Sequence, residues 1–414
     1  MAPKLRIAVW YNLPSGGAKR ALNDHLRGLV ARGHTIEAWR PPVMQADYLP
    51  ISDIVPEHVV AHGAPVGEGT GYADKVARHV IRQLTIRSTM RRHSRLAAAQ
   101  IEAGGFDVLF ANTCMQYHSP WIGRYVSGPK LLYLQEPKRP FYEPMPRLPW
   151  PRLPEAIRRS WGPQAIKLKL RDALDIRSYR LQAADELQNA QTYDRILVNS
   201  NFSRESILRA YGLDSTVSYL GVDADRFENR ERPREPFVVS VGVFGASKDP
   251  EFIVRALGTV GESRPPLVWV ANMVDPVYRP RIESLARDLG VDLQIRQYVP
   301  DAELLDLLNR ASVMAYAPRL EPFGYAPLEA NACGLPAVVV AEGGVKETVT
   351  DGLNGLVVPH RPEAMGAAIA GLLADPARAR AMGERAAAHV RERWTLERAT
   401  DELERNLTEV AKGV

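Results

Sequence analysis

Residues 5–39 read LRIAVWYNLPSGGAKRALNDHLRGLVARGHTIEAW, and this order predicts a strand, a glycine turn, a helix and a second strand. Leu5–Tyr11 is a compact apolar run with β-branched and aromatic members, as expected of a buried strand. Ser15–Gly17 breaks the run, and residues 18–32 carry Ala, Leu and Val at helical spacing. A glycine then ends the helix before a second strand at Thr35–Trp39. A strand–helix–strand unit implies a parallel sheet with a right-handed crossover.

The same alternation continues to the end of the chain. Further strands are expected over residues 106–111, 131–135, 195–198, 237–241, 267–270, 292–295, 313–316, 337–340 and 355–358. Helices are expected over residues 79–103, 173–190, 251–259, 280–289, 301–310, 327–333 and 345–349, and from residues 200 and 362 onward. A shift to Gly, Asp, Arg and Pro around 219–234 indicates a linker between two doubly wound units. Ligands of such sheets bind at the carboxyl ends of the strands.

Length and composition agree with two globular α/β domains. The chain has 414 residues, of which 45% are apolar and 24% charged. It has two cysteines, too few for a disulfide framework, and its first apolar run is too short for the core of a signal peptide. These features predict a cytoplasmic protein. A net charge of +5 favours anionic partners such as phosphates.

The segment 138–171 is unusually basic and carries aromatic residues and many prolines. Because of its prolines, this segment cannot form one regular helix or strand over its whole length. It has three interpretations: an exposed insertion, a patch that brings the protein to the inner surface of a membrane and a lipid-linked acceptor, or a wall of an acceptor pocket. Peripheral membrane contact through 138–171 is therefore a hypothesis for this chain.

The most informative motif is APRLEPFGYAPLEA, residues 317–330, which follows a strand and begins a helix. Gly324 allows a ligand to approach the backbone closely, and Pro327 suits the first turn of a helix. The helix N-terminus presents free N–H groups and a positive dipole end to an anion. Glu321 and Glu329 supply two carboxylates, which are good acceptors for sugar and ribose hydroxyls.

The spacing of Glu321 and Glu329 resembles the Glu-x7-Glu signature of retaining GT-B glycosyltransferases of family 4, the glycosyl transferases group 1. Neighbouring segments of the chain resemble the same family: 196–202, 219–223, 330–336, 343–347 and 351–357. The resemblance extends over nearly the whole chain and is strongest from about residue 195 to 358.

The resemblance implies a GT-B fold, in which two Rossmann-like domains with doubly wound parallel sheets face a cleft. Residues 1–222 would form the N-terminal acceptor-binding domain, and residues 223–394 the C-terminal domain that binds the nucleotide sugar. A C-terminal helix at about 395–414 would pack back on the first domain. The implied activity is that of a retaining hexosyltransferase, which moves a sugar from a UDP- or GDP-sugar to an acceptor hydroxyl. The acceptor would be a saccharide, a lipid-linked saccharide or a small molecule, in glycan, glycolipid or glycosylated-metabolite synthesis.

The resemblance also implies roles for the residues of the motif. Glu329 would bind the ribose hydroxyls, and Glu321 would contact the donor sugar. Backbone N–H groups near Phe323, Gly324 and Tyr325 would assist Glu321.

Further donor contacts would come from outside the motif. Gly16 and Gly17 would form a loop near the diphosphate, and Lys248 would neutralise the departing diphosphate. Tyr298 and Val299 would lie beside the base. No metal or other cofactor is expected, because cations and helix dipoles can meet the charge that develops on the leaving group.

Two positions depart from the family pattern. Val243 stands where the family usually has Arg, which leaves Lys248 as the matching cation; Arg319, two residues before Glu321, is a candidate to replace the missing charge. Gln135 stands where the family often has a His that faces the donor sugar, and a glutamine can form hydrogen bonds but cannot act as an acid. His118 is a candidate to be recruited in its place.

Two other functions remain open. Val243 and Gln135 motivate a GT-B scaffold with impaired catalysis, and a second enzyme class on the same fold is a nucleotide-sugar epimerase or a phosphorylase. Nucleic-acid binding has only the basic composition in its favour, so no nucleic-acid partner is expected.

Overall fold

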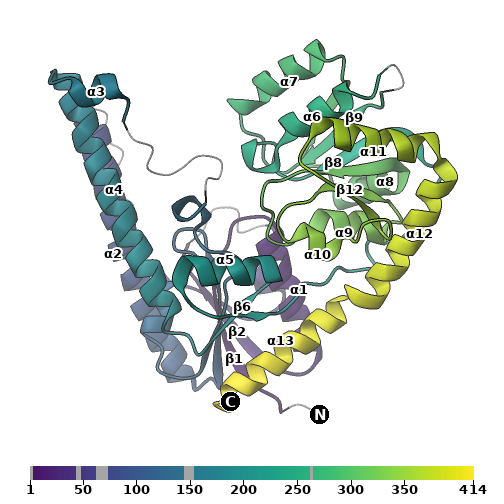
Figure 1. Ribbon diagram of the computed structural model, residues 1–414. Helices are drawn as coiled ribbons and strands as arrows, with labels where there is room; N and C mark the ends of the chain where they lie inside the picture. Colours follow the sequence, from purple (N-terminus) through teal and green to yellow (C-terminus); the bar gives the residue numbers. More distant parts are fainter. Residues whose placement is uncertain (1–2, 43–47, 62–72, 144–152, 262–263) are drawn as a thin grey trace. The chain divides into compact units, whose positions relative to one another are not determined.

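The computed structural model describes residues 3–42, 48–61, 73–143, 153–261 and 264–414, with the backbone alone over 73–84. The chain divides into two compact units (Figure 1). The first consists of Met1–Val198, Arg204–Ser218 and Thr400–Val414, and the second of Asn199–Ser203 and Tyr219–Ala399.

The first unit is built on a seven-stranded parallel sheet with the order β3-β2-β1-β4-β5-β6-β7. Its strands are β1 (Arg6–Asn12), β2 (Thr35–Arg40), β3 (Glu57–Val59), β4 (Val108–Cys114), β5 (Lys130–Tyr133), β6 (Arg195–Val198) and β7 (Thr216–Val217). The strand order reverses between β1 and β4, so the carboxyl ends of these two strands flank a topological switch point.

The helices of the first unit pack on this sheet and on each other. They are α1 (Gly17–Ala31), α2 (Ala73–Gly104), α3 (Glu155–Arg159), α4 (Pro163–Ala190), most of α5 (Asn201–Tyr211) and most of α13 (Leu396–Ala411), with short 3-10 turns η1 (Ile51–Asp53), η2 (Trp121–Arg124) and η3 (Arg139–Phe141). The main core lies between the sheet and α2, around Trp10, Trp39 and Trp121.

The C-terminal helix α13 contacts the first helix and strand β6. Arg32 forms ion pairs with Asp401 (2.6 Å) and Glu404 (2.7 Å), and Arg195 donates to Asn406 (2.9 Å). Leu403 is completely buried. Residues more than 360 positions apart in the chain thereby stabilise the same sheet.

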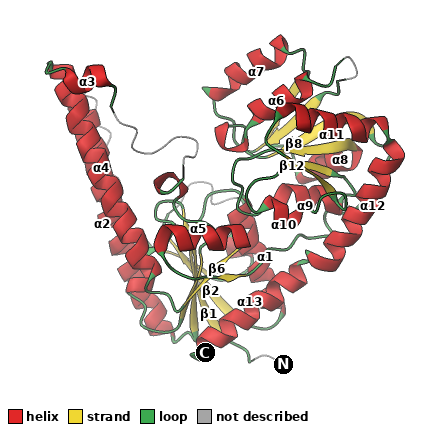
Figure 2. Cartoon of the chain, in the orientation of Figure 1, coloured by secondary structure: helices red, strands yellow, loops and turns green. Residues whose placement is uncertain are grey.

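The second unit has a six-stranded parallel sheet with the order β10-β9-β8-β11-β12-β13. Its strands are β8 (Glu235–Val241), β9 (Leu267–Ala271), β10 (Leu293–Gln297), β11 (Ala311–Tyr316), β12 (Ala337–Val340) and β13 (Gly355–Val358). Its helices are α6 (Pro250–Gly258), α7 (Tyr278–Asp288), α8 (Asp301–Arg310), α9 (Tyr325–Ala332), α10 (Val345–Thr348), α11 (Pro362–Ala374) and α12 (Pro376–Arg393), with the 3-10 turn η4 (Ala246–Lys248). Figure 2 shows α6 and α11 on one face of this sheet and α9 and α10 on the other. The order reverses between β8 and β11, which defines the switch point of this unit.

The predicted class, α/β with two doubly wound parallel sheets, is confirmed. Two local predictions were wrong. Helix α4 begins at Pro163 rather than near residue 173, because a proline is well accommodated in the first turn of a helix. Strand β5 ends at Tyr133, so Gln135 lies beyond it, in the left-handed region at φ 61°.

Candidate functional site

A loop between β11 and α9 holds most of the predicted donor-binding residues. Gly324 precedes α9 with φ 100°, a conformation that L side chains rarely adopt. Gly343 lies in the loop after β12, and a Cβ atom there would lie 2.4 Å from the carbonyl oxygen of Glu321. The loops after β11 and β12 therefore pack backbone against backbone. The amide of Gly344 donates to the same oxygen at 2.6 Å. These contacts hold residues 320–324 at the carboxyl edge of the second sheet.

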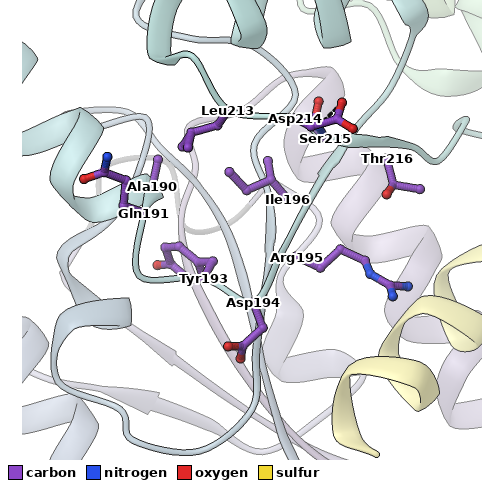
Figure 3. A pocket seen from close by; sticks show the side chains of 10 residues that line it. All are labelled: Ala190, Gln191, Tyr193, Asp194, Arg195, Ile196, Leu213, Asp214, Ser215 and Thr216. Carbon is purple, nitrogen blue, oxygen red and sulfur yellow. Dashed lines mark hydrogen bonds between the residues drawn. The ribbon is translucent and has the colours of Figure 1, made fainter. Parts of the chain in front are cut away.

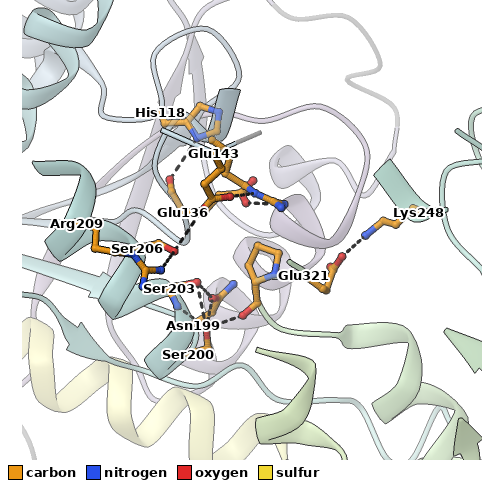
Figure 4. Close-up of polar contacts among 12 residues, drawn as sticks. His118, Glu136, Glu143, Asn199, Ser200, Ser203, Ser206, Arg209, Lys248 and Glu321 are labelled. Carbon is orange, nitrogen blue, oxygen red and sulfur yellow. Dashed lines mark hydrogen bonds and ion pairs between the residues drawn. The ribbon is translucent and has the colours of Figure 1, made fainter. Parts of the chain in front are cut away.

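Lys248 and Glu321 form the central polar pair of the second unit. Lys248 follows β8 and Glu321 follows β11, so neighbouring strands bring their side chains together at the switch point. The Nζ of Lys248 lies 2.6 Å from Oε2 of Glu321 (Figure 4). Burial lowers the pKa of Lys248, but the charge of Glu321 and the nearby phenol of Tyr316 outweigh burial and raise it above its usual value. The ammonium is therefore charged at neutral pH.

Glu329 and Phe323 belong to the same segment, and the side chains of both are buried. Glu329, the fifth residue of α9, is buried, with 4% of its surface exposed. Phe323 is also buried and contacts the rings of Tyr325 and Trp394, with centroid distances of 5.4 and 5.7 Å. These aromatic contacts fix the entry to α9, whose first backbone N–H groups point out of its N-terminus.

Ser200 and Glu347 also fix this loop, and sequence reasoning assigned them no role in the site. The hydroxyl of Ser200 donates to the carbonyl of Pro322 at 2.5 Å and accepts from the amide of Ser203, as expected of the predicted helix cap. Glu347 of α10 accepts from the amides of Asn201 and Phe202, both at 2.9 Å. The start of α5 is thereby joined to the residue that follows Glu321.

The other predicted residues of the second unit lie on loops at the same edge of the sheet. Arg319 forms an ion pair with Glu342 at 2.7 Å, so its charge is partly balanced within the protein. Tyr298 and Val299 follow β10; Tyr298 has φ 56°, donates its amide to Ala271 and is 69% exposed. Val243, in the loop after β8, is half-buried and supplies no charge.

In the first unit, Gly16 and Gly17 form the turn between β1 and α1. Gly16 has φ 150°, and its carbonyl accepts from the amide of Arg20 at 3.1 Å, which begins the helix. This turn leaves the first N–H groups of α1 at the carboxyl edge of the first sheet, where a helix N-terminus attracts an anion.

Gln135 is the central residue of a tight turn after β5. The amide of Glu136 donates to the carbonyl of Leu134 at 2.7 Å, and φ at Gln135 is 61°, the values of a γ-turn of the rare, strained type. Nδ1 of His118 lies 3.3 Å from the carbonyl of Glu136, so the structure brings His118 and the Gln135 turn together (Figure 4). Burial, and then the charge of Lys138, lowers the pKa of His118 to about 3. The imidazole is therefore neutral at pH 7.

Glu186 of α4 supports the loop after β4, which contains His118, and it was not found from the sequence. Its carboxylate accepts from the amides of His118 (3.0 Å) and Ser119 (2.8 Å) and is completely buried. Burial raises its pKa to about 7. In the sequence it is one of several acids on a long polar helix, and no local signal separates it from the exposed ones.

A pocket of about 350 Å³ lies elsewhere in the first unit, before the amino ends of β6 and β7 (Figure 3). It is lined by residues 190–191, 193–196 and 213–216. Because ligands of doubly wound sheets bind at the carboxyl ends, we do not assign the donor to this pocket.

Two doubly wound parallel sheets, each with glycine turns and helix N-termini at its carboxyl edge, define the GT-B class of fold. Residues 221–389 match the family model described as glycosyl transferases group 1, which confirms the predicted resemblance over this part of the chain.

The chain is also similar to curated proteins that are described as glycosyltransferases. The chain is 32% identical over 229 residues to the D-inositol 3-phosphate glycosyltransferase of Kribbella flavida, a match that covers 49% of this chain and 54% of the relative. It is 33% identical over 213 residues to the GDP-mannose-dependent alpha-(1-6)-phosphatidylinositol monomannoside mannosyltransferase of Mycolicibacterium smegmatis, over 46% of this chain and 56% of the relative. The chain thus spans about half the length of the curated relatives it matches.

The fold itself is shared over almost the full length with solved structures. Sucrose-phosphate synthase from Thermosynechococcus elongatus superposes with a TM-score of 0.72 at 18% identity, covering 99% of this chain and 100% of that one. Anabaena HepE in complex with UDP and glucose superposes with a TM-score of 0.68 at 17% identity, covering 98% and 99%. Among the helices that the structure describes, none is both long and apolar enough to cross a bilayer.

Proposed function

We propose that this chain is a glycosyltransferase that moves a sugar from a nucleoside-diphosphate sugar to an acceptor hydroxyl, with retention of the anomeric configuration. The observation that carries the proposal is the Lys248–Glu321 pair at the switch point of the second sheet, next to the N-terminus of α9. The cation and the helix N-terminus can bind a diphosphate, and the carboxylate beside them can accept hydrogen bonds from the hydroxyls of a sugar joined to it.

The proposed roles follow from the chemistry of the departing group. Negative charge develops on the diphosphate as the glycosidic bond breaks, and Lys248 together with the N–H groups at the start of α9 would stabilise it. Glu321 would accept hydrogen bonds from the hydroxyls of the donor sugar, and Glu329 from those of the ribose. The acceptor would attack from the face that the diphosphate leaves, and the phosphate oxygen would take the acceptor proton.

The base of the donor is an open choice between uracil and guanine. The Anabaena structure contains UDP and glucose, and the Mycolicibacterium relative is described as GDP-mannose-dependent. We propose a cytoplasmic site of action and an acceptor that is a saccharide, a lipid-linked saccharide or a small molecule.

Thermal unfolding with UDP, GDP, UDP-glucose and GDP-mannose tests donor binding. A ligand at ~100 times its Kd stabilises the folded protein by about 2.7 kcal/mol, which shifts the melting temperature. We expect one base series to produce this shift and Glu329→Ala to abolish it, whereas Glu384→Ala, at an exposed position on α12, retains it. If no nucleotide shifts the melt, the proposal is wrong.

Incubation with the binding donor and a panel of inositol phosphates and saccharides then tests transfer. The coupling of the anomeric proton in the NMR spectrum of the product reports retention or inversion, and an inverted product would refute the retaining assignment. We propose that transfer needs no metal ion, so turnover should survive EDTA treatment. Recovery that requires added Mg²⁺ would contradict this part.

A scaffold with impaired catalysis is the second candidate, and the features that favour it are Val243 and Gln135. It predicts a donor-induced shift of the melt without transfer to any acceptor. An epimerase would instead interconvert the donor sugar without an acceptor, which NMR spectra of the donor alone would reveal.

A further inference from the structure

The end of the α2–α4 helix pair carries an unusual surface. Helices α2 and α4 have 32 and 28 residues and lie side by side, with α3 at the end remote from the first sheet (Figure 1). We call residues 153–171, which comprise α3, the turn after it and the start of α4, the tip patch. The basic segment 138–171 is thereby divided, because Arg139 forms ion pairs with Glu136 and Glu143 and Phe141 is buried.

Large apolar side chains of the tip patch are exposed to water. Trp161 is 81% exposed, Leu170 57%, Ile166 49% and Leu168 37%. Ile166 and Leu170 are four residues apart on α4 and therefore share one face of the helix. Exposed apolar groups that cluster in this way mark a surface that another phase or molecule covers.

The charge of the tip patch is strongly positive. It contains one acidic residue, Glu155, and five basic residues: Arg158, Arg159, Lys167, Lys169 and Arg171. The Nζ of Lys169 lies 4.6 Å from the centroid of the Trp161 ring and donates to the carbonyl of Ser160 at 2.9 Å. These contacts place the Lys169 ammonium beside the indole ring, which stays exposed to water.

We propose that the tip patch docks onto a lipid surface that contains anionic headgroups. Indole rings favour the boundary between headgroups and acyl chains, where Ile166 and Leu170 would also leave water. The Lys and Arg side chains can bury their stems and keep their charges among the phosphates. A nucleic acid would use the charges but leave the aliphatic residues in water, so lipid fits the patch better. Docking is independent of sugar transfer and needs no donor.

Sedimentation of the full chain with vesicles tests the proposal. We expect binding to vesicles of phosphatidylcholine and phosphatidylglycerol at roughly two to one, and much weaker binding to phosphatidylcholine alone, because each basic residue near an anionic surface contributes about fivefold. K167Q/K169Q/R171Q should weaken binding by about tenfold or more. Trp161→Ser should weaken it by about tenfold through lost apolar contact.

Matched controls separate the tip patch from general charge and apolarity. R378Q/R380Q/R391Q removes the same charge from exposed positions on α12, and Leu208→Ala shortens a 54% exposed side chain on α5. Both should bind vesicles as the unmodified chain does, and all variants should keep its melting temperature. The proposal is overturned if the chain does not bind anionic vesicles, if the α12 variant loses as much binding as the tip variant, or if a DNA duplex at equal phosphate concentration competes fully with the vesicles.

Discussion

Lys248 and Glu321 come from loops that are 73 positions apart and share one short hydrogen bond. Glu321→Gln keeps the shape of the side chain but removes the charge that balances Lys248. Under the proposed function we expect kcat to fall by about 100-fold or more. The carboxylate of Glu321 would contact the reacting sugar and would orient the Lys248 ammonium beside the diphosphate. Steady-state kinetics with the identified donor measures it, with Glu384→Gln as control. Unchanged kcat would remove Glu321 from the mechanism.

The buried carboxyl of Glu186 predicts a pH dependence of stability. Its pKa is raised to about 7 in the folded state, so the folded protein holds a proton that the unfolded chain has already lost. This contribution to stability is therefore fully present below the usual pKa of Glu and is lost as pH rises through about 7. Relative to Glu186→Gln, the unmodified chain should lose about 1–3 kcal/mol of unfolding free energy between about pH 5 and pH 8.

Urea unfolding of both proteins across this range measures the difference. Because His118 and the other titrating groups are present in both chains, their contributions largely cancel in the comparison. Parallel stability curves would mean that Glu186 is ionised at all these pH values and that its two backbone donors suffice to keep it charged.

At the scale of the elements, the contact between the loops after β11 and β12 holds Glu321 in place. Gly343 has φ 68°, and a Cβ atom there would lie 2.4 Å from the carbonyl oxygen of Glu321. Gly343→Ala should cost about 3 kcal/mol of stability and weaken donor binding, because it adds a backbone clash to the strain of a positive φ. Gly352 has φ 74° but no atom within 4 Å of the added Cβ. Gly352→Ala should therefore cost only about 1 kcal/mol and leave donor affinity unchanged.

Urea unfolding and donor titration of the two alanine variants separate strain from the clash. Equal effects at both positions would show that the close approach of the two loops does not hold the site.

At the scale of the whole molecule, the chain returns to its first sheet at its end. Leu403 of α13 is completely buried in the first unit, so Leu403→Ala should reduce the free energy of unfolding by about 2–4 kcal/mol. Leu208→Ala, at a 54% exposed site, should change it by about 0.5 kcal/mol or less. Chemical denaturation compares the two. A negligible effect at Leu403 would mean that the last helix contributes little to the first unit.

The sequence alone predicted most strands and helices in their order along the chain, because burial in a doubly wound sheet demands apolar runs separated by glycine turns, and these are local features. It missed the short strands β3 and β7 and the short helix α3. The resemblance of segment 317–330 to a family also supplied the candidate donor-binding residues, whose roles stay predictions. The ion pairs of Lys248 and Arg319 could not be derived locally, since they depend on which strands become neighbours.

Only the tertiary structure decided which of many similar side chains are special. Glu186 became a buried carboxyl because α4 covers the loop after β4, and Gln135 entered a strained turn because β5 ends early. Trp161 is exposed because it lies in the turn between α3 and α4, at the end of the helix pair. Helix α4 begins ten residues earlier than predicted. Burial, strain and exposure arise from packing between segments distant in sequence, whereas hydrophobic periodicity and turn residues act within a few positions of each other.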